Sequence, residues 1–163
     1  SNMIKIFVTG GTFDKDYDEK NGRLYFKETH MNEILKLGRS KVDVNIETLM
    51  MLDSLDMDED DRKLIIEKCT KSKENHIVIT HGTDTMTDTA IDLGQRKLNK
   101  TIVLTGAMIP YKFGTSDGLF NIASALAYVQ TLTKGVYVAM NGRVFTYDKV
   151  LKNRDTGIFE ELI

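Results

Sequence analysis

The chain has 163 residues, of which 41% are hydrophobic, and this is enough for one domain with a packed core. Its 22 basic and 24 acidic residues give a formal net charge of -2, so we expect neither a nucleic-acid surface nor a membrane partner. The single cysteine, Cys69, excludes an internal disulfide and favours a reducing compartment, so a cytoplasmic protein is expected. The three histidines show no metal-ligand spacing, and we expect no metal or other cofactor.

Five apolar runs typical of strands recur along the chain, with helical patterns between them. Strands are expected at residues 4–8, 42–47, 77–80, 101–105 and 136–140, and helices at 29–38, 58–72, 83–98 and 116–131. Strands that alternate with helices predict βαβ units and a parallel sheet. The apolar runs are continuous, as in strands that are covered on both faces. We therefore predict an α/β fold in three layers, with a doubly wound, mostly parallel sheet of the Rossmann-like type.

The pattern changes after residue 140. Asn141-Gly142 lies between two apolar runs and predicts a C-terminal β-hairpin that joins residues 136–140 to 143–147. The tail is polar with an apolar end that should pack on this domain or on a second copy of the chain, and we expect residues 158–163 to lie at or near the contact between copies. Ser1-Asn2 before Met3 resembles a cloning remnant, and residues 1–163 otherwise read as a single domain.

Two threonine-rich turns directly after apolar strands carry the strongest functional signal. Thr9-Gly10-Gly11-Thr12 follows the first strand, and His81-Gly82-Thr83-Asp84-Thr85 follows the third. Ligands of open α/β sheets bind beyond the carboxyl ends of the strands, so both turns are expected to bring a threonine hydroxyl to one edge. A hydroxyl becomes a nucleophile beside a base, and Asp84 with Lys100, which precedes the next strand, is the expected base. This combination predicts a hydrolase with a threonine nucleophile.

The two turns also have structural interpretations. Gly10 and Gly11 permit a strand-to-loop turn with positive φ, whereas a phosphate-binding loop would need a different glycine spacing. Thr83 or Asp84 is a suitable N-cap for the following helix. His81 by itself is more often a hydrogen-bonded structural residue than a catalytic one.

Three further expectations concern the surroundings of the nucleophile. Lys100 is ordinarily a solvated lysine and takes part in catalysis only if it is buried beside Asp84. The polar residues 14–23, directly after Thr12, are expected to form a mobile loop that acts as a lid. Backbone N–H groups of the glycine-rich turns are expected to stabilise a developing oxyanion.

Taken together, these segments resemble the bacterial-type asparaginase/glutaminase family. The matching segments are Thr9-Gly10-Gly11-Thr12, Asp53-Ser54-Leu55-Asp56-Met57, His81-Gly82-Thr83-Asp84-Thr85-Met86, the run from Lys100 to Met108, and Ser116-Asp117-Gly118 with Phe120-Asn121. The resemblance implies an amidohydrolase in which Thr12 attacks a small carboxamide such as L-asparagine. Thr83, Asp84 and Lys100 would relay the proton. It also implies a short, standalone form of the family, without the second, smaller domain of typical members.

The same resemblance implies how a substrate is held. Ser54 and Asp84 would bind its α-carboxylate and α-amine, and Tyr25 would be the catalytic tyrosine of the lid, with Tyr17 as the competing candidate. The implied substrate-binding residues are Gly11, Tyr17, Ser54, Gly82 and Asp84. Lys15, which stands where the family usually has a small residue, is expected to offer a further contact to an anion. The expected ligand is a small carboxamide or amino acid, and the expected assembly is a homodimer or higher homo-oligomer. Two alternatives stay open: a weakly active protein that binds an amino acid or dicarboxylate, and a subunit completed by another chain.

Overall fold

The computed structural model describes residues 3–163 and has a six-stranded central sheet in the order β4-β1-β5-β6-β7-β8. The first five of these strands are parallel, and β8 runs antiparallel to β7. The strands are β1 (Ile4–Gly10), β4 (Val44–Leu52), β5 (His76–Thr80), β6 (Thr101–Thr105), β7 (Gly135–Met140) and β8 (Arg143–Thr146). The predicted α/β class with a mostly parallel sheet is confirmed.

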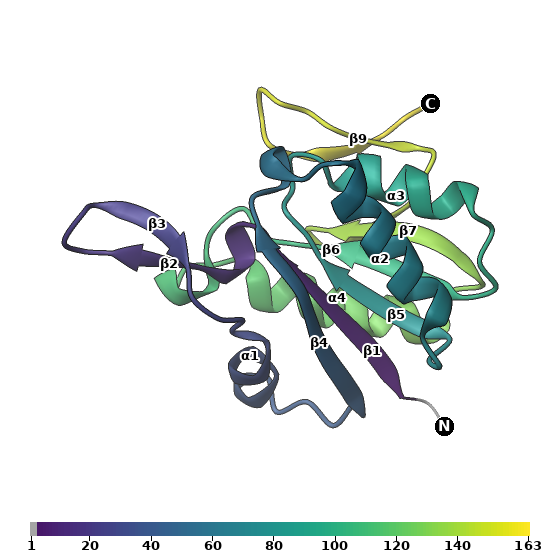
Figure 1. Cartoon of the computed structure of the whole chain (residues 1–163), viewed down its shortest axis with the longest axis horizontal. Coiled ribbons are helices and arrows are strands. Elements are labelled where there is room, and N and C mark those ends of the chain that lie inside the picture. Colours follow the sequence, from purple (N-terminus) through teal and green to yellow (C-terminus); the bar gives the residue numbers. More distant parts are fainter. Residues whose placement is uncertain (1–2) are drawn as a thin grey trace.

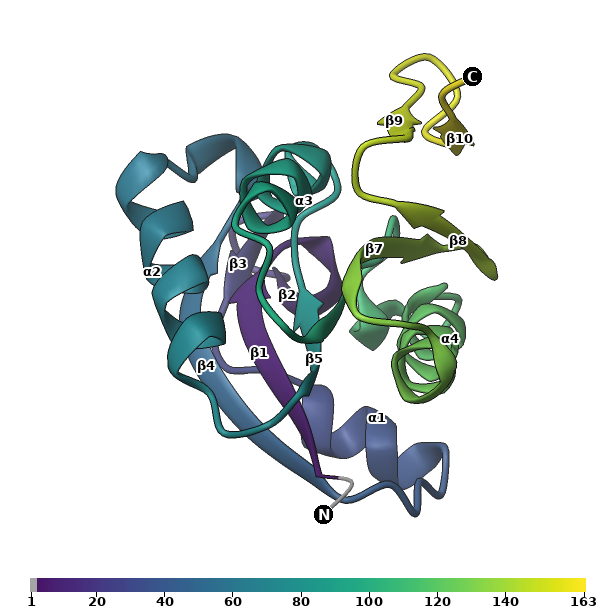
Figure 2. The ribbon, with the colours of Figure 1, turned by 90° about the vertical axis from the view of Figure 1, so that its right-hand side faces the viewer.

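Helices cover both faces of this sheet and complete the three predicted layers (Figure 1). They are α1 (Met31–Leu37), α2 (Glu59–Lys71), α3 (Met86–Gln95) and α4 (Gly118–Thr131). Figure 2 shows α2 and α3 on one face and α1 and α4 on the other. Val78 and Ile79 are consecutive in β5 and lie in different core clusters, because neighbouring side chains of a strand point to opposite faces. Burial on both faces explains why the apolar runs are continuous.

The start of α3 differs from the expectation of a cap at Thr83 or Asp84. The helix begins at Met86 with Thr85 in the N-cap position. Thr85 is tied to Ser54 instead: its N–H donates to Ser54 Oγ at 3.1 Å, and its hydroxyl donates to Ser54 O at 2.9 Å. The expected capping role is therefore wrong, and the side chains of Thr83 and Asp84 are available for other contacts.

The prediction of a mobile loop at residues 14–23 is also wrong, because most of these residues belong to a β-hairpin. β2 (Lys15–Asp18) pairs antiparallel with β3 (Arg23–Phe26). The Asp18 carboxylate closes the turn by accepting hydrogen bonds from the N–H groups of Lys20 at 3.0 Å and Asn21 at 3.3 Å. The hairpin projects from the body of the molecule (Figure 1), so its strands need no alternating apolar pattern.

Two hairpins end the chain. The predicted pairing of β7 with β8 is confirmed, and both residues of the Asn141-Gly142 turn have the positive φ, 56° and 80°, that a type I′ turn requires. A second hairpin, β9 (Val150–Lys152) with β10 (Phe159–Glu161), lies beyond the sheet in Figure 2. Phe159 is only 1% exposed and anchors this hairpin to the core.

Candidate active site

Three turns at the carboxyl edge of the sheet are in direct backbone contact. Gly11 follows β1, Gly82 follows β5, and Ser54 begins the short 3-10 helix η2 (Ser54–Asp56) after β4. A Cβ atom at Gly11 would lie 2.5 Å from Gly82 Cα, and one at Gly82 would lie 2.7 Å from Ser54 Oγ. Only glycine permits such an approach. The two glycines therefore pack the turns that carry Thr12 and Thr83 against each other.

The backbone N–H of Gly11, which was expected to stabilise an oxyanion, is hydrogen-bonded within the protein. It donates to the carbonyl of Leu52, at the end of β4, at 2.9 Å. A backbone donor that is already used in this way is not available to a developing oxyanion. We therefore exclude the Gly11 N–H from that role, while the contribution of Gly82 stays a prediction.

A lysine from β9 reaches the second threonine turn. Lys152 Nζ donates to Thr83 Oγ1 and to Asp84 Oδ1, both at 2.9 Å. The Lys152 side chain is 10% exposed and that of Asp84 is 38% exposed, so the ammonium group is the more buried partner. A largely buried ammonium is tolerated when it is paired and hydrogen-bonded. The cluster of Thr83, Asp84 and Lys152 thus joins a hydroxyl to an amine that can exchange its proton and to a carboxylate that orients the amine.

Lys100, the lysine predicted for this cluster, lies at the opposite edge of the sheet. It precedes β6, and five residues of a strand separate it from the carboxyl edge by about 16 Å. Its Nζ donates to Cys69 O at 2.8 Å and to Ser72 O, at the carboxyl end of α2. The expected contact between Lys100 and Asp84 is wrong. A cation at this position instead satisfies carbonyl groups at a helix end.

Arg154 is a second functional candidate that the sequence alone did not reveal. Its Nη1 donates to Asp84 Oδ1 at 3.1 Å, and its Nη2 donates to Asp84 O at 2.6 Å. Lys152 ends β9, and Arg154 lies two positions later in the turn of the β9–β10 hairpin, so both side chains reach Asp84 from one short segment. This spacing was visible in the sequence, but a strand of three residues gives too weak a signal to place it.

His81 is a structural residue with a neutral ring. It is fully buried, with Nδ1 2.8 Å from Gly82 O and Nε2 2.7 Å from Thr89 Oγ1. Burial, with a smaller contribution from the nearby charge of Arg62, lowers the pKa of His81 from 6.5 to about 4, although the hydrogen bond to Gly82 O acts in the opposite direction. The ring therefore helps to fix the backbone at Gly82, and its hydrogen bonds go to Gly82 and Thr89.

Acid is expected to destabilise the protein through His81. The unfolded chain takes up a proton at this histidine below pH 6.5, whereas the folded protein does so only near pH 4. Stability that is complete above pH 6.5 is therefore lost as the pH falls towards 4, by up to about 3 kcal/mol. Urea unfolding of His81→Gln should show a smaller loss between pH 7 and 4.5. His76→Gln is the matched control, and an equal loss in all three proteins would contradict the assignment.

Ser54 and Lys15 both have partners within the protein. Ser54 is 3% exposed, and its hydroxyl oxygen accepts the N–H of Thr85 while its own proton stays available as a donor. Lys15 Nζ lies 2.5 Å from Asp53 Oδ1. The charge of Lys15 is therefore compensated by Asp53, which corrects the expectation that it offers a free anion contact. A role for Ser54 in substrate binding stays a prediction.

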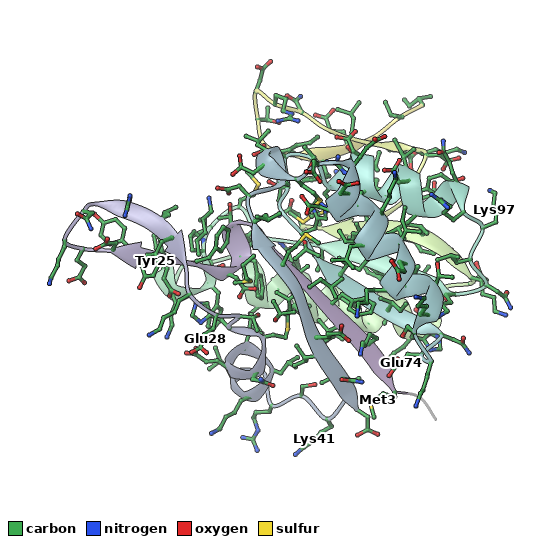
Figure 3. The ribbon with its side chains drawn as sticks, in the orientation of Figure 1. Met3, Tyr25, Glu28, Lys41, Glu74 and Lys97 are labelled. Carbon is green, nitrogen blue, oxygen red and sulfur yellow. The ribbon has the colours of Figure 1, made fainter. Side chains whose placement is uncertain are left out.

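The two tyrosine candidates share the β2–β3 hairpin, where Figure 3 labels Tyr25. Tyr25 pairs with Asp16, and Tyr17 pairs with Leu24, so the two rings point to opposite faces of the hairpin. They are 41% and 51% exposed, and within residues 3–163 neither one hydrogen-bonds to the Thr83 cluster. At most one of them can close over the site in one position of the hairpin, and which one does so stays open.

The Cys69 thiol is buried, and burial raises its pKa to about 12, so the reactive thiolate is disfavoured. Over residues 3–163, no three His, Cys, Asp or Glu side chains are grouped so that they could hold a metal ion. In the same range, no helix combines the length and the apolar character that a membrane span needs.

Comparisons with known proteins give consistent matches over nearly the whole chain. Residues 3–158 match the family model described as Asparaginase, N-terminal. The chain is 31% identical over 166 residues to L-asparaginase 2 of Escherichia coli, a match that covers 95% of the chain and 47% of that protein. It is 32% identical over 162 residues to a glutamyl-tRNA(Gln) amidotransferase subunit of Methanococcus vannielii, with 95% and 37% covered.

A solved structure supports the same relationship. Probable cytoplasmic L-asparaginase from Campylobacter jejuni superimposes with a TM-score of 0.85 at 29% identity, over 99% of this chain and 53% of that chain. The chain thus spans about half the length of the E. coli relative, with 47% of that protein covered, and 37% of the length of the M. vannielii protein.

Proposed function

The chain belongs to the asparaginase family through its match to the amino-terminal domain, and from this membership we propose that it hydrolyses a small carboxamide, such as L-asparagine, with Thr12 as the nucleophile. The observation that carries the proposal is the pair of hydrogen bonds from Lys152 Nζ to Thr83 Oγ1 and Asp84 Oδ1. A site that only binds a ligand needs no such arrangement of hydroxyl, amine and carboxylate next to a second threonine.

The proposed reaction has two steps. In the first, Thr12 Oγ attacks the amide carbonyl carbon, and the proton of its hydroxyl passes by way of Thr83 and Lys152 to the departing nitrogen. The C–N bond breaks, ammonia leaves and an acyl-threonine ester stays on the protein. In the second step, water attacks the ester carbonyl, the acid is released and Thr12 recovers its proton. Asp84 keeps the amine of Lys152 oriented in both steps.

Ammonia release from a panel of small carboxamides tests this function. The wild-type protein is expected to release ammonia from at least one member, and Thr12→Ala is expected to abolish the release. Thr131→Ala, at the exposed end of α4, is the matched control and is expected to keep the wild-type rate. If no amide in the panel releases ammonia, or if Thr12→Ala keeps the rate, the proposal is wrong.

A second candidate function is that of a protein completed by another chain. It is favoured by the similarity to the M. vannielii protein, which is named as one part of an amidotransferase. A third is an amino-acid or dicarboxylate sensor. Under either of these, the isolated chain would release no ammonia, whereas aspartate or another dicarboxylate would still raise the melting temperature of a sensor.

The assembly and location of the protein are also kept as predictions. Ile158 and Leu162 are 50% and 43% exposed on either side of β10, which leaves apolar surface for a second copy. A homodimer or higher homo-oligomer is proposed on this basis, and light scattering of the wild-type chain at micromolar concentration would test it.

The proposed cytoplasmic location rests on the single cysteine and on the similarity to the probable cytoplasmic L-asparaginase of C. jejuni.

A further inference from the structure

The hairpin of β2 and β3 has two faces that carry different residues. Side chains alternate along a strand, and directly paired residues of neighbouring strands share a face. Lys15 therefore lies on the same face as Tyr17 and as Phe26, its partner in β3. The Lys15 Nζ atom, 5.7 Å from the centroid of the Phe26 ring, agrees with this assignment. Asp16 lies with its partner Tyr25 on the opposite face, and the two sides are called the Lys15 face and the Asp16 face.

The Lys15 face contacts two segments at the carboxyl edge of the sheet. Lys15 Nζ lies 2.5 Å from Asp53 Oδ1, in the segment that follows β4. The Tyr17 ring meets the Phe113 ring edge-on, with 6.4 Å between the centroids, in the segment that follows β6. In the sheet, β4 and β6 flank β1 and β5, the two strands that end in the threonine-rich turns. Both contacts thus turn the Lys15 face towards the part of the edge where these turns lie.

The Asp16 face is anchored elsewhere, at the start of α1. Asp16 Oδ1 lies 3.0 Å from Nε2 of His30, the residue directly before this helix. The two side chains are 17% and 8% exposed, so the pair is largely buried. The N–H of His30 also donates to Asp14 Oδ1 at 2.8 Å, at the base of the hairpin. Because α1 covers one face of the sheet (Figure 2), the Asp16 face, with Tyr25, is turned towards that helix layer.

The ion pair of the Lys15 face also lies next to the expected substrate site. Asp53 directly precedes Ser54, which is expected to bind a carboxylate and is hydrogen-bonded to Thr85 in the turn after β5. Lys15 and Tyr17 are only two positions apart in β2. The pair of Lys15 with Asp53 thus holds the strand that carries Tyr17 beside the segment that carries Ser54.

We propose that Tyr17, and not Tyr25, is the tyrosine that closes over the candidate active site and hydrogen-bonds to the bound amide. For the identity of the ligand, the inference rests on the proposed function. Tyr17 is 51% exposed, and among residues 3–163 its hydroxyl has no hydrogen-bond partner, so it is free to donate to a ligand or to accept from one. Its ring contact is with Phe113, which is itself 45% exposed, so this contact does not bury the ring.

Disulfide trapping tests which face closes, without a ligand and without turnover. Leu55, which is 68% exposed in η2, is the fixed position. A disulfide forms only when the two Cα atoms approach to within about 7 Å. On oxidation with diamide, Tyr17→Cys combined with Leu55→Cys should therefore become cross-linked. Tyr25→Cys combined with Leu55→Cys is the matched control and should keep both thiols reduced. The native Cys69 is buried and does not compete.

Turnover gives a second, independent test. Tyr17→Phe should lower the turnover of the best carboxamide about tenfold to a hundredfold, the effect of losing one hydrogen bond to a charged group. Tyr25→Phe removes an equivalent hydroxyl from the Asp16 face, and its loss should be at least about tenfold smaller. Tyr147→Phe, beside the first residues of β7 at the amino edge of the sheet, should keep the wild-type rate.

Several results would overturn the inference: cross-linking of the Tyr25→Cys pair, cross-linking of neither pair, or a Tyr17→Phe rate equal to that of the wild type or above that of Tyr25→Phe. Failure of the proposed function looks different. In that case no amide releases ammonia, yet the Tyr17→Cys pair alone is cross-linked, so the Lys15 face still closes and the ligand is not an amide. If ammonia is released while only the Tyr25→Cys pair is cross-linked, the choice of Tyr17 alone is wrong.

Discussion

Lys152→Met is expected to lower the turnover of the best carboxamide by about 10²- to 10⁴-fold, the usual contribution of a positioned proton-transfer group. The methionine keeps much of the length of the side chain but removes the hydrogen bonds to Thr83 and Asp84. Because Lys152 takes part in proton transfer in the proposed reaction, its loss should change the Michaelis constant much less than the turnover number. Steady-state ammonia release from the same amide measures both quantities.

Lys100→Met is the matched control for this substitution. Lys100 binds carbonyl groups at the end of α2, so its loss should lower the free energy of unfolding by about 1 kcal/mol and leave turnover unchanged. Urea unfolding and ammonia release, measured on both variants, separate the two lysines. Loss of turnover in Lys100→Met with normal turnover in Lys152→Met would restore the assignment that the structure contradicts.

Thr12→Ala and Thr83→Ala are each expected to reduce turnover by several orders of magnitude, and the double variant should be scarcely slower than either single one. Residues that act as one catalytic unit are strongly non-additive, because removal of one leaves the other without a function. The two turns touch at Gly11 and Gly82, so the threonines are placed to act as such a unit. Rates of the three variants at saturating amide give the comparison.

Ligand binding provides the control for the threonine variants. Each alanine removes only a few atoms from a turn whose backbone contacts involve glycine, so binding of the acid product should persist within a few-fold. Rate losses that multiply in the double variant would show that the two threonines act independently. A loss of binding as large as the loss of turnover would mean that the substitutions disrupt the fold of the turns.

The sequence predicted well the buried strands and the two turns that carry the site. Continuous apolar runs identify strands buried on both faces, and the carboxyl-edge rule for parallel sheets places the turns after β1 and β5 together. The same rule also shows why Lys100 was misplaced: a residue directly before a parallel strand lies at the amino edge. The position of Lys100 directly before its strand already indicated the amino edge of the sheet. The resemblance of residues 100–108 to a family motif nevertheless placed this lysine beside Asp84.

The parts of the site that the sequence did not predict come from segments with weak sequence signals. β9 and the hairpin of β2 with β3 are short, and turn hydrogen bonds such as those of Asp18 and Asn153 stabilise the two hairpins. Their positions relative to the central sheet depend on tertiary contacts, such as the burial of Val150 and Phe159 in the core, which local patterns do not encode. The contact between Gly11 and Gly82 likewise joins residues 71 positions apart, so only the three-dimensional structure shows why both are glycine.

Mass spectrometry of protein quenched in acid during turnover tests the central claim most directly. The tryptic peptide of residues 6–15 contains Thr12 and one other threonine, Thr9, and fragmentation distinguishes the two. We expect a mass increment equal to the acyl group of the amide on Thr12, and none on the same peptide from Thr12→Ala. An increment on Thr9 or on the peptide that contains Thr83, or ammonia release by Thr12→Ala at the wild-type rate, would contradict the account.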